Sequence, residues 1–267
     1  MKKQKLKLSI VIPCSTDIRI KGCIESIDEN VEVVVVLNGA SKEVTNIVKN
    51  LKVKIIVLKK ANLSNALNYG IKNSTNDKII FMDSDCKFQK GSIRKVNNAL
   101  NDNLIVKGKV AFQHNDVFSK IVADTRDYVN YDDPKPYNPF LAINKKIKKY
   151  SGGYYFDSQI HWTEDADFYS RLKRSNIKVK YLFSAMVYHP PLTFVQDLRS
   201  AFRYGVGKRI RVEKGRANSM GTHFSNIPDL TNKKGLLAGM YYFLWSISYM
   251  FGYFYQIVID PYRVKNK

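Results

Sequence analysis

The sequence predicts an α/β protein with a mostly parallel sheet flanked by helices, followed by a C-terminal helical region. Over the first hundred residues, short apolar segments alternate with helical stretches, a spacing typical of βαβ units. The valine-rich segment Val31–Leu37 indicates a strand covered on both faces. Residues 235–259 contain no charged side chain. We therefore expect two regions, an α/β domain at 1–191 and, at 192–267, a basic amphipathic segment followed by an apolar helix.

The elements of the α/β domain follow from local patterns. Ser41 stands where a helix N-cap is expected, two residues before Glu43. Ser151-Gly152-Gly153 predicts a tight loop, and the proline-rich stretch 132–139 predicts irregular structure. The expected strands are 8–13, 31–37, 53–58, 78–82, 104–112, 179–183 and 186–189. The expected helices end near Glu29, begin after Ser41, and span 62–73 and 163–174.

The bulk composition limits the class of ligand. The 267 residues include 44 Lys and Arg against 23 Asp and Glu, a net charge of +21. Such a surface attracts nucleic acid, anionic lipid or a phosphorylated small molecule. The three cysteines form no CxxC pair, which argues against a disulfide framework and a structural zinc site and favours reduced thiols. The apolar run Leu8–Pro13 is too short for a signal peptide.

The C-terminal region is predicted to form a basic amphipathic segment followed by an apolar helix. Apolar residues recur every four positions from Phe194 to Ile210, interleaved with Lys and Arg. Gly205 and Gly207 are expected to interrupt or kink this helix. Residues 235–259 are long enough to cross about 30 Å of hydrocarbon at about 1.5 Å per residue. A full crossing, an interfacial or re-entrant placement, and a helix buried in a core or dimer interface all remain open.

Asp83-Ser84-Asp85 is the strongest chemical motif. It follows the apolar segment 79–82, at the carboxyl end of an expected buried strand, where open α/β sheets bind ligands. Alternation along an extended chain points both carboxylates the same way, so they can share Mg²⁺ or Mn²⁺ and bridge it to a diphosphate. The alternative is a solvated acidic turn that caps the next helix.

A second acidic group, Glu164-Asp165 with Asp167, leads into the helix that contains Arg171. A carboxylate at such a junction can act as the base that deprotonates an attacking hydroxyl. Acids in the first turn of a helix are equally explained by the helix dipole.

The order of motifs resembles glycosyltransferase family 2, an inverting family with the GT-A fold. The matching features cover about 180 residues in the family's order. They are the first strand 8–13, the turn Asn38-Gly39-Ala40-Ser41, the segment 62–71, Asp83-Ser84-Asp85, Gly152-Gly153, Glu164-Asp165 with Arg171-Leu172, and a strand ending at His189.

This resemblance implies roles residue by residue. Asp165 is the expected general base, and Glu164 helps to shape the acceptor pocket. Asp83 contacts the ribose, and Asp85 ligates Mn²⁺ or Mg²⁺. The remaining implied metal ligands are Asp83 and His189, the latter being alternatively a strand-end histidine satisfied by backbone. The implied nucleotide-sugar contacts are Pro13, Ser15, Asn38, Asn62, Asn68, Asp83, Ser84 and Gly153.

Two positions depart from the family. Asn38 stands where the family usually has an aspartate that accepts from uracil, and Ser15 lies near a position that often carries a stacking aromatic. The nucleobase, the sugar and the acceptor therefore stay open.

The tail resembles those of family members that build envelope polysaccharides on polyprenyl-diphosphate lipids. This implies a lipid-linked or cell-envelope saccharide acceptor and a location at the cytoplasmic face of the membrane, peripheral or anchored through the C-terminus. Arg199, Arg203 and Lys208 are expected to meet anionic headgroups or, alternatively, a diphosphate at the active site.

Two other classes of protein are weighed against this one. A sugar nucleotidyltransferase would share the sheet and the carboxylates, but Pro13–Asp17 is not the Gly-rich, Lys-bearing phosphate loop that it normally has. A nucleic-acid-binding protein would explain the +21 charge, but neither the uncharged tail nor the acidic motifs.

Overall fold

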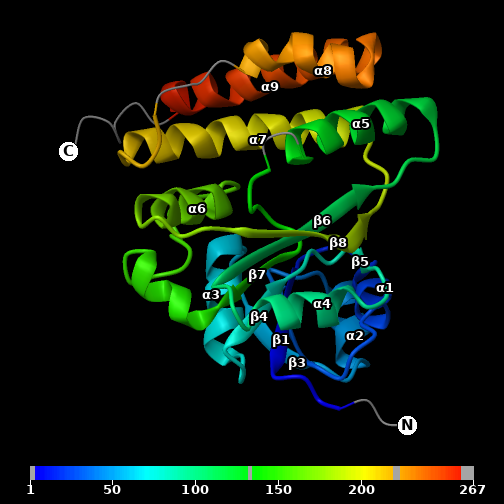
Figure 1. Cartoon of the computed structure of the whole chain (residues 1–267), viewed down its shortest axis with the longest axis vertical. Helices are drawn as coiled ribbons and strands as arrows, with labels where there is room; N and C mark the ends of the chain where they lie inside the picture. The colour runs from blue at the N-terminus through cyan, green and yellow to red at the C-terminus, as the bar shows by residue number, and fades with distance from the viewer. Residues whose placement is uncertain (1–3, 132–133, 219–222, 260–267) are drawn as a thin grey trace. The chain divides into compact units, whose positions relative to one another are not determined.

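A computed structural model describes residues 4–131, 134–218 and 223–259, and they form two compact units (Figure 1). The first unit takes in 1–111, 136–159 and 171–189, and the second 112–135, 160–170 and 190–267, apart from the residues that are not described. Helix α6 (Glu164–Arg174) contributes residues to both. Part of the proline-rich stretch, residues 132–133, lies outside the described residues.

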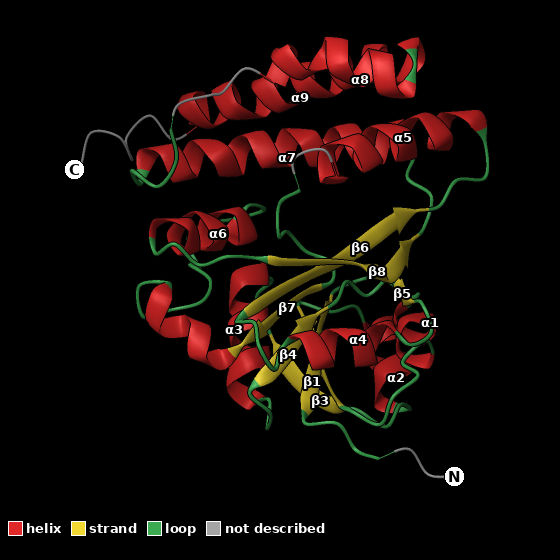
Figure 2. Ribbon diagram, viewed as in Figure 1, coloured by secondary structure: helices red, strands yellow, loops and turns green. Residues whose placement is uncertain are grey.

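The first unit is built on one sheet with the strand order β3-β2-β1-β4-β7-β6-β8-β5 (Figure 2). Its parallel part comprises β1 (Leu8–Cys14), β2 (Glu32–Asn38), β3 (Lys54–Leu58) and β4 (Lys78–Phe81). The chain winds from β1 outward to β3 and then returns to β4 on the other side of β1. The carboxyl ends of β1 and β4 therefore flank the switch point, where sheets of this kind bind ligands.

The rest of the sheet is mixed, so the mostly parallel sheet of the sequence prediction describes only its first half. Strand β7 (Leu141–Asn144) runs antiparallel to β4 and to β6 (Ile105–Phe112). The prediction of two separate closing strands at 179–183 and 186–189 is wrong. These residues form one strand, β8 (Lys180–His189), which pairs antiparallel with the two-residue β5 (Lys87–Phe88). Because β5 and β7 are so short, the hydrophobic pattern of the sequence did not predict them.

The helices of this unit connect the strands. They are α1 (Ile20–Glu25), α2 (Lys42–Lys49), α3 (Leu63–Asn73) and α4 (Ser92–Ala99). The Ser41 hydroxyl accepts from the Val44 N–H, which confirms the predicted cap of α2. At Gly70, α3 approaches β1 so closely that a Cβ would lie 2.2 Å from Val11 Cγ1. Only glycine allows this contact, because overpacking a core is destabilising.

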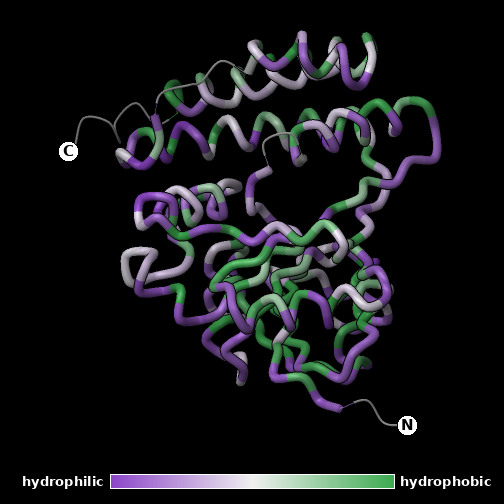
Figure 3. The backbone as a smooth tube through the Cα atoms, viewed as in Figure 1, coloured by the Kyte–Doolittle hydropathy of each residue, from purple (hydrophilic) through white to green (hydrophobic). Residues whose placement is uncertain are grey.

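The core of the first unit lies on the central strands, whose hydrophobic positions are visible in Figure 3. Ile10, Val11 and Ile12 of β1 and Val34, Val35 of β2 are fully buried. Both faces of these strands are covered, as the continuous apolar runs predicted.

The second unit is helical. Its helices are α5 (Val117–Tyr131), α7 (Phe194–Glu213), α8 (Ile227–Lys234) and α9 (Leu236–Ile259), together with part of α6 and the short 3₁₀ helix His223–Asn226. Helix α9 packs against α5, α7 and α8. Tyr128, Tyr242, Trp245 and Tyr249 bury their rings between these helices. Of the described helices none is sufficiently long and apolar to cross a bilayer, and that includes α9, for which a crossing was one of the open placements.

Helix α7 runs without interruption, so the expected break at Gly205 and Gly207 is wrong. Both glycines are buried at close helix contacts. A Cβ at Gly205 would lie 1.9 Å from the Tyr249 carbonyl oxygen of α9, and one at Gly207 would lie 2.4 Å from the His161 carbonyl oxygen. Tight packing on both neighbours outweighs the low helix propensity of glycine.

Candidate active site

The polar residues of the first unit gather at the carboxyl ends of the parallel strands. Asp83-Ser84-Asp85 follows β4, and all three residues are partly exposed. Pro13 and Ser15 lie at the end of the neighbouring strand β1, whose register pairs Pro13 with Val36 of β2. The Ser41 N–H donates to the Ser15 carbonyl oxygen (2.9 Å), which joins the loops after β1 and β2. The structure thus brings these predicted residues to one edge of one sheet.

Asp85 is the centre of a group that can hold a cation. Its Oδ2 lies 3.7 Å from His189 Nε2, at the end of β8. The ligand atoms of Asp85, Cys86 and His189 all lie within 4.8 Å of one another. Among the described residues, Asp83 is not part of this group, although the sequence predicted that it would share the ion. A carboxylate and an imidazole are suitable ligands for Mn²⁺, and the carboxylate also suits Mg²⁺.

The three cysteines surround the Asp83-Ser84-Asp85 turn. The Cys23 thiol donates to the Asp83 carbonyl oxygen (3.5 Å), and the Cys86 thiol donates to Asp85 Oδ1 (3.4 Å). The Cys14 side chain hydrogen-bonds with that of Ser84. Burial raises the pKa of Cys23 and Cys86 far above the ordinary thiol value, and the charges of Asp83 and Asp85 raise it further. The neutral Cys86 thiol orients Asp85 through its hydrogen bond.

Arg19 and Asp17, which belong to none of the sequence motifs, complete this edge. The Arg19 Nη2 donates to Asp85 Oδ2 (3.4 Å), and the Arg19 Nε donates to Asp17 Oδ1 (2.8 Å). These bonds from Arg19 hold the pKa of Asp17 below its ordinary value. A polar loop directly after β1 was the available signal, but its contact with Asp85 arises only in the fold. Arg19 places a fixed positive charge beside Asp85.

Three predicted asparagines form a structural link at the same side of the sheet. Asn38 Oδ1 accepts from the Asn62 backbone N–H (2.8 Å), so the oxygen expected to meet the base already has a partner. The Asn62 Nδ2 donates to the Ser158 carbonyl oxygen (2.9 Å). Asn68 bonds both the carbonyl oxygen and the N–H of Phe156. These amides therefore hold the segment 156–158 against α3.

Gly153 lies elsewhere. It lines a pocket of about 510 Å³ together with Lys145, Lys146, Lys148 and Lys149. The Lys145 N–H donates to the Asp77 carbonyl oxygen (2.8 Å), which puts this pocket near the amino end of β4, opposite to Asp83.

The loop that contains Gly153 is held by Arg171. Its guanidinium donates to the carbonyl oxygens of Ser151, Tyr154 and Tyr155 and stacks at 4.0 Å on the Tyr154 ring. Within the first unit, Arg171 thus anchors the loop that contains Gly152-Gly153.

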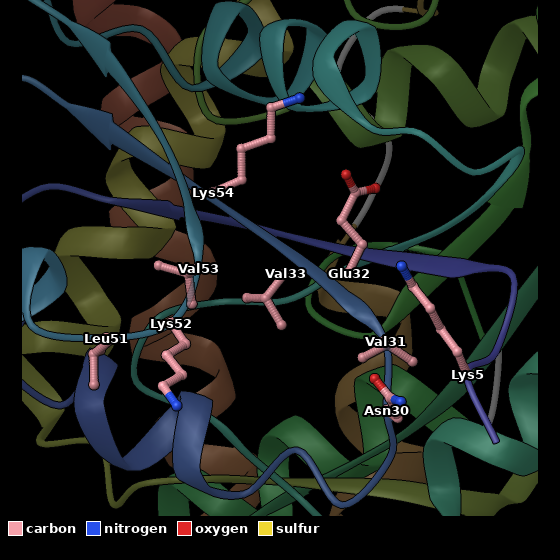
Figure 4. Close-up of a pocket in the computed structure, with 9 residues that line it drawn as sticks. All are labelled: Lys5, Asn30, Val31, Glu32, Val33, Leu51, Lys52, Val53 and Lys54. Atoms are coloured by element: carbon pink, nitrogen blue, oxygen red, sulfur yellow. The ribbon is translucent and has the colours of Figure 1, made fainter. Parts of the chain in front are cut away.

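A second pocket, of about 440 Å³, is lined by neither Asp83 nor Asp85 (Figure 4). Its walls come from the amino ends of β2 and β3 and include Glu32, Lys52 and Lys54. The carboxyl edge remains the candidate active site because the functional groups converge there, and ligands of such sheets bind at that edge.

The acidic motif at the start of α6 belongs to the second unit. Glu164 is buried, and Asp165 is partly exposed, with its Oδ1 accepting from the Ala166 N–H (2.7 Å). Asp167 is fully buried and lies 3.5 Å from the Arg216 guanidinium. Of the three carboxylates, Asp165 is thus the one that solvent reaches most readily, as a base for an incoming hydroxyl requires.

The predicted basic residues of α7 differ in their surroundings. Arg199 and Arg203 are exposed, whereas Lys208 is only partly exposed. Burial lowers the pKa of Lys208, and the charge of Arg211 lowers it further. Arg211 is itself buried and donates to the Ala166 carbonyl oxygen (3.0 Å) and to Ser170 Oγ (2.7 Å). Helix α7 therefore contributes part of its positive charge to the interior of this unit.

The mixed sheet, its switch-point carboxylates and its C-terminal helices define a glycosyltransferase of the GT-A fold. The profile of the family Glycosyl transferase family 2 matches residues 9–155, more than half of the chain, and the protein belongs to this family. The family and the fold class that the sequence predicted are thereby confirmed.

The fold also resembles solved structures. One of them is the crystal structure of S. aureus TarS 1-349, with a TM-score of 0.53 at 14% sequence identity, covering 98% of this chain and 92% of that one. At this identity the likeness concerns the fold alone. No curated protein sequence matches the chain.

Proposed function

We propose that this glycosyltransferase moves a sugar from a nucleotide-diphosphate donor to a hydroxyl of a lipid-linked or cell-envelope saccharide, with inversion at the anomeric carbon. The observation that carries the proposal is the convergence of Asp85, His189 and Arg19 on the carboxyl edge beside β1 and β4. Family membership supports a nucleotide sugar as the donor and a saccharide as the acceptor.

Asp85 and His189 would hold Mn²⁺ or Mg²⁺, and Asp83 is proposed to contact the ribose. When bound, the cation supplies positive charge that stabilises the departing nucleoside diphosphate. Arg19 adds charge of the same sign from the protein, and Cys86 orients Asp85 through its hydrogen bond. The proposed base is Asp165, which removes the acceptor's proton as the hydroxyl attacks from the face opposite to the leaving group.

The proposal places the protein at the cytoplasmic face of the membrane, where a polyprenyl-diphosphate-linked acceptor would be met. The charge of +21 supports attraction to an anionic surface. The exposed Arg199 and Arg203 are suited to this attraction, whereas Lys208 is less available.

The test is a thermal-shift panel of nucleotide sugars with Mn²⁺, Mg²⁺ or a chelator. A ligand at one hundred times its Kd stabilises the folded state by about 2.7 kcal/mol, so the true donor raises the Tm when the cation is present. We expect Asp85→Asn to lose this cation-dependent shift. A nucleoside diphosphate, rather than pyrophosphate, must then appear as the product. Release of pyrophosphate would overturn the proposal in favour of a nucleotidyltransferase.

A further inference from the structure

Helix α9 presents a continuous apolar face to solvent. Leu236 is 68%, Phe251 66% and Val258 76% exposed. Their large apolar neighbours recur at spacings of one, three, four and seven residues, so they share one side of the helix. We name this face the outer stripe. It consists of Leu236, Leu237, Met240, Phe243, Leu244, Phe251, Phe254, Tyr255, Val258 and Ile259.

The opposite side of α9 is buried against other helices of the second unit. Tyr241, Trp245, Tyr249 and Tyr253 are buried there. A Cβ at Gly252 would lie 1.9 Å from the Phe202 carbonyl oxygen of α7, so the two helices are in backbone contact. This contact prevents α9 from rotating to bury the outer stripe against α7. The stripe is therefore a fixed surface of the folded unit.

Helix α7, which the sequence predicted to meet the headgroups, is less suited to do so along its second half. The Arg209 Nε donates to Glu213 (2.8 Å), and Arg211 is buried. Only the first half of α7 keeps exposed cations, Arg199 and Arg203. Most of the exposed large apolar residues of this unit belong to α9.

The charges near the two ends of α9 indicate which kind of partner binds the outer stripe. Lys234 precedes the helix and is exposed, and the sequence after it contains Arg263, Lys265 and Lys267 with a single acid, Asp260. If two copies paired through their stripes, basic segments would meet in either helix orientation, and like charges repel. An anionic lipid surface instead offers complementary charge at both ends and an apolar layer between them.

We infer that the outer stripe of α9 is a membrane-docking surface that lies in the plane of the bilayer interface and enters the boundary between headgroups and acyl chains. At about 1.5 Å per residue the helix would lie along roughly 36 Å of that interface. The inference rests on the proposed membrane location of the enzyme and names the surface responsible for it.

The experiment measures sedimentation of the full chain with phosphatidylcholine vesicles that contain or lack phosphatidylglycerol. The double variant Leu244→Glu/Phe251→Glu should bind the anionic vesicles at least about tenfold more weakly than wild type, because charged side chains oppose burial in the acyl region. Val57→Glu is the matched control, since Val57 is 67% exposed on β3 of the other unit, and it should bind as wild type does.

A second variant keeps the test independent of the folding of the first. Phe251→Trp should add emission that brominated lipid chains quench beyond the quenching seen in wild type, where Trp162 is exposed and Trp245 lies on the buried side of α9. Undiminished vesicle binding by a folded Leu244→Glu/Phe251→Glu would overturn the inference. So would light scattering that shows a dimer which this variant dissociates, without vesicle binding by wild type. Neither measurement needs a sugar donor, so failure of the proposed enzymatic activity would be seen separately.

Discussion

Asp85 owes its chemical environment to three neighbours from different parts of the chain. Arg19 comes from the loop after β1, Cys86 is adjacent in sequence, and His189 ends β8. The guanidinium and the thiol hold this carboxylate in one direction through hydrogen bonds, and the imidazole lies 3.7 Å from it. Burial disfavours the thiolates of Cys23 and Cys86 beside this turn.

The buried thiols should resist alkylation in the folded protein. Burial raises the pKa of Cys23 and Cys86, so the reactive thiolate is scarce even at a pH near the ordinary thiol pKa of about 8.5. We expect mass spectrometry after iodoacetamide treatment to find both unmodified in the native state. Both should react fully in denaturant. Rapid labelling of native Cys86 at pH 8 would contradict the arrangement described for it.

Asp165 should be required for transfer but not for donor binding. Replacing it by asparagine removes a proton acceptor with little change in size, and general-base catalysis is worth about 10²–10⁴-fold in rate. We expect Asp165→Asn to keep the donor-induced Tm shift and to lose transfer by about this factor. The matched control, Asp124→Asn on α5, removes a partly exposed carboxylate that pairs with Lys120 and should leave both readouts unchanged. A wild-type transfer rate in Asp165→Asn would exclude it as the base.

At the scale of elements, glycines decide how closely helices approach. Gly70 brings α3 onto β1, and Gly205 with Gly252 brings α7 and α9 into backbone contact. At each of these glycines the backbone lies directly against the neighbouring element, so the contact does not tolerate even one added methyl group.

Gly252→Ala should destabilise the second unit. The new Cβ would overlap the Phe202 carbonyl oxygen, and overpacking of this kind costs about 1–3 kcal/mol. Thermal denaturation followed by circular dichroism should show a lower Tm. The control is Gly22→Ala in α1, where the Cβ would meet only the flexible end of Lys87. Because alanine is the better helix former by up to about 1 kcal/mol, this variant should be neutral or stabilised. Equal effects of the two substitutions would refute the close contact of α7 and α9.

At the scale of the whole molecule, the charge of +21 governs association with polyanions. Such attraction acts without directional contacts and is screened by salt. Donor binding is expected to differ, because a held cation and Arg19 act at close range on a diphosphate.

Duplex DNA should therefore bind only at low salt. Binding through phosphate contacts alone loses about 10³–10⁵ in affinity between roughly 50 and 200 mM salt. We expect gel retardation to vanish across this range, while the donor-induced Tm shift measured on the same protein persists. Tight, sequence-selective retardation at the higher salt would instead revive the nucleic-acid-binding interpretation.

The sequence by itself determined the order of strands and helices in the parallel half of the sheet. It also determined the cap at Ser41, the position of Asp83-Ser84-Asp85 after a buried strand, and the family. These features depend on local periodicity and on residues that are near one another along the chain. The amino-acid sequence is therefore sufficient to predict them.

The tertiary structure alone decided that Arg19 reaches Asp85 and that Gly153 lines a lysine pocket rather than the carboxyl edge. It also kept α7 whole through Gly205 and selected the side of α9 that faces solvent. These outcomes depend on contacts between residues far apart in the chain, and the packing energy of such contacts overrides local propensity.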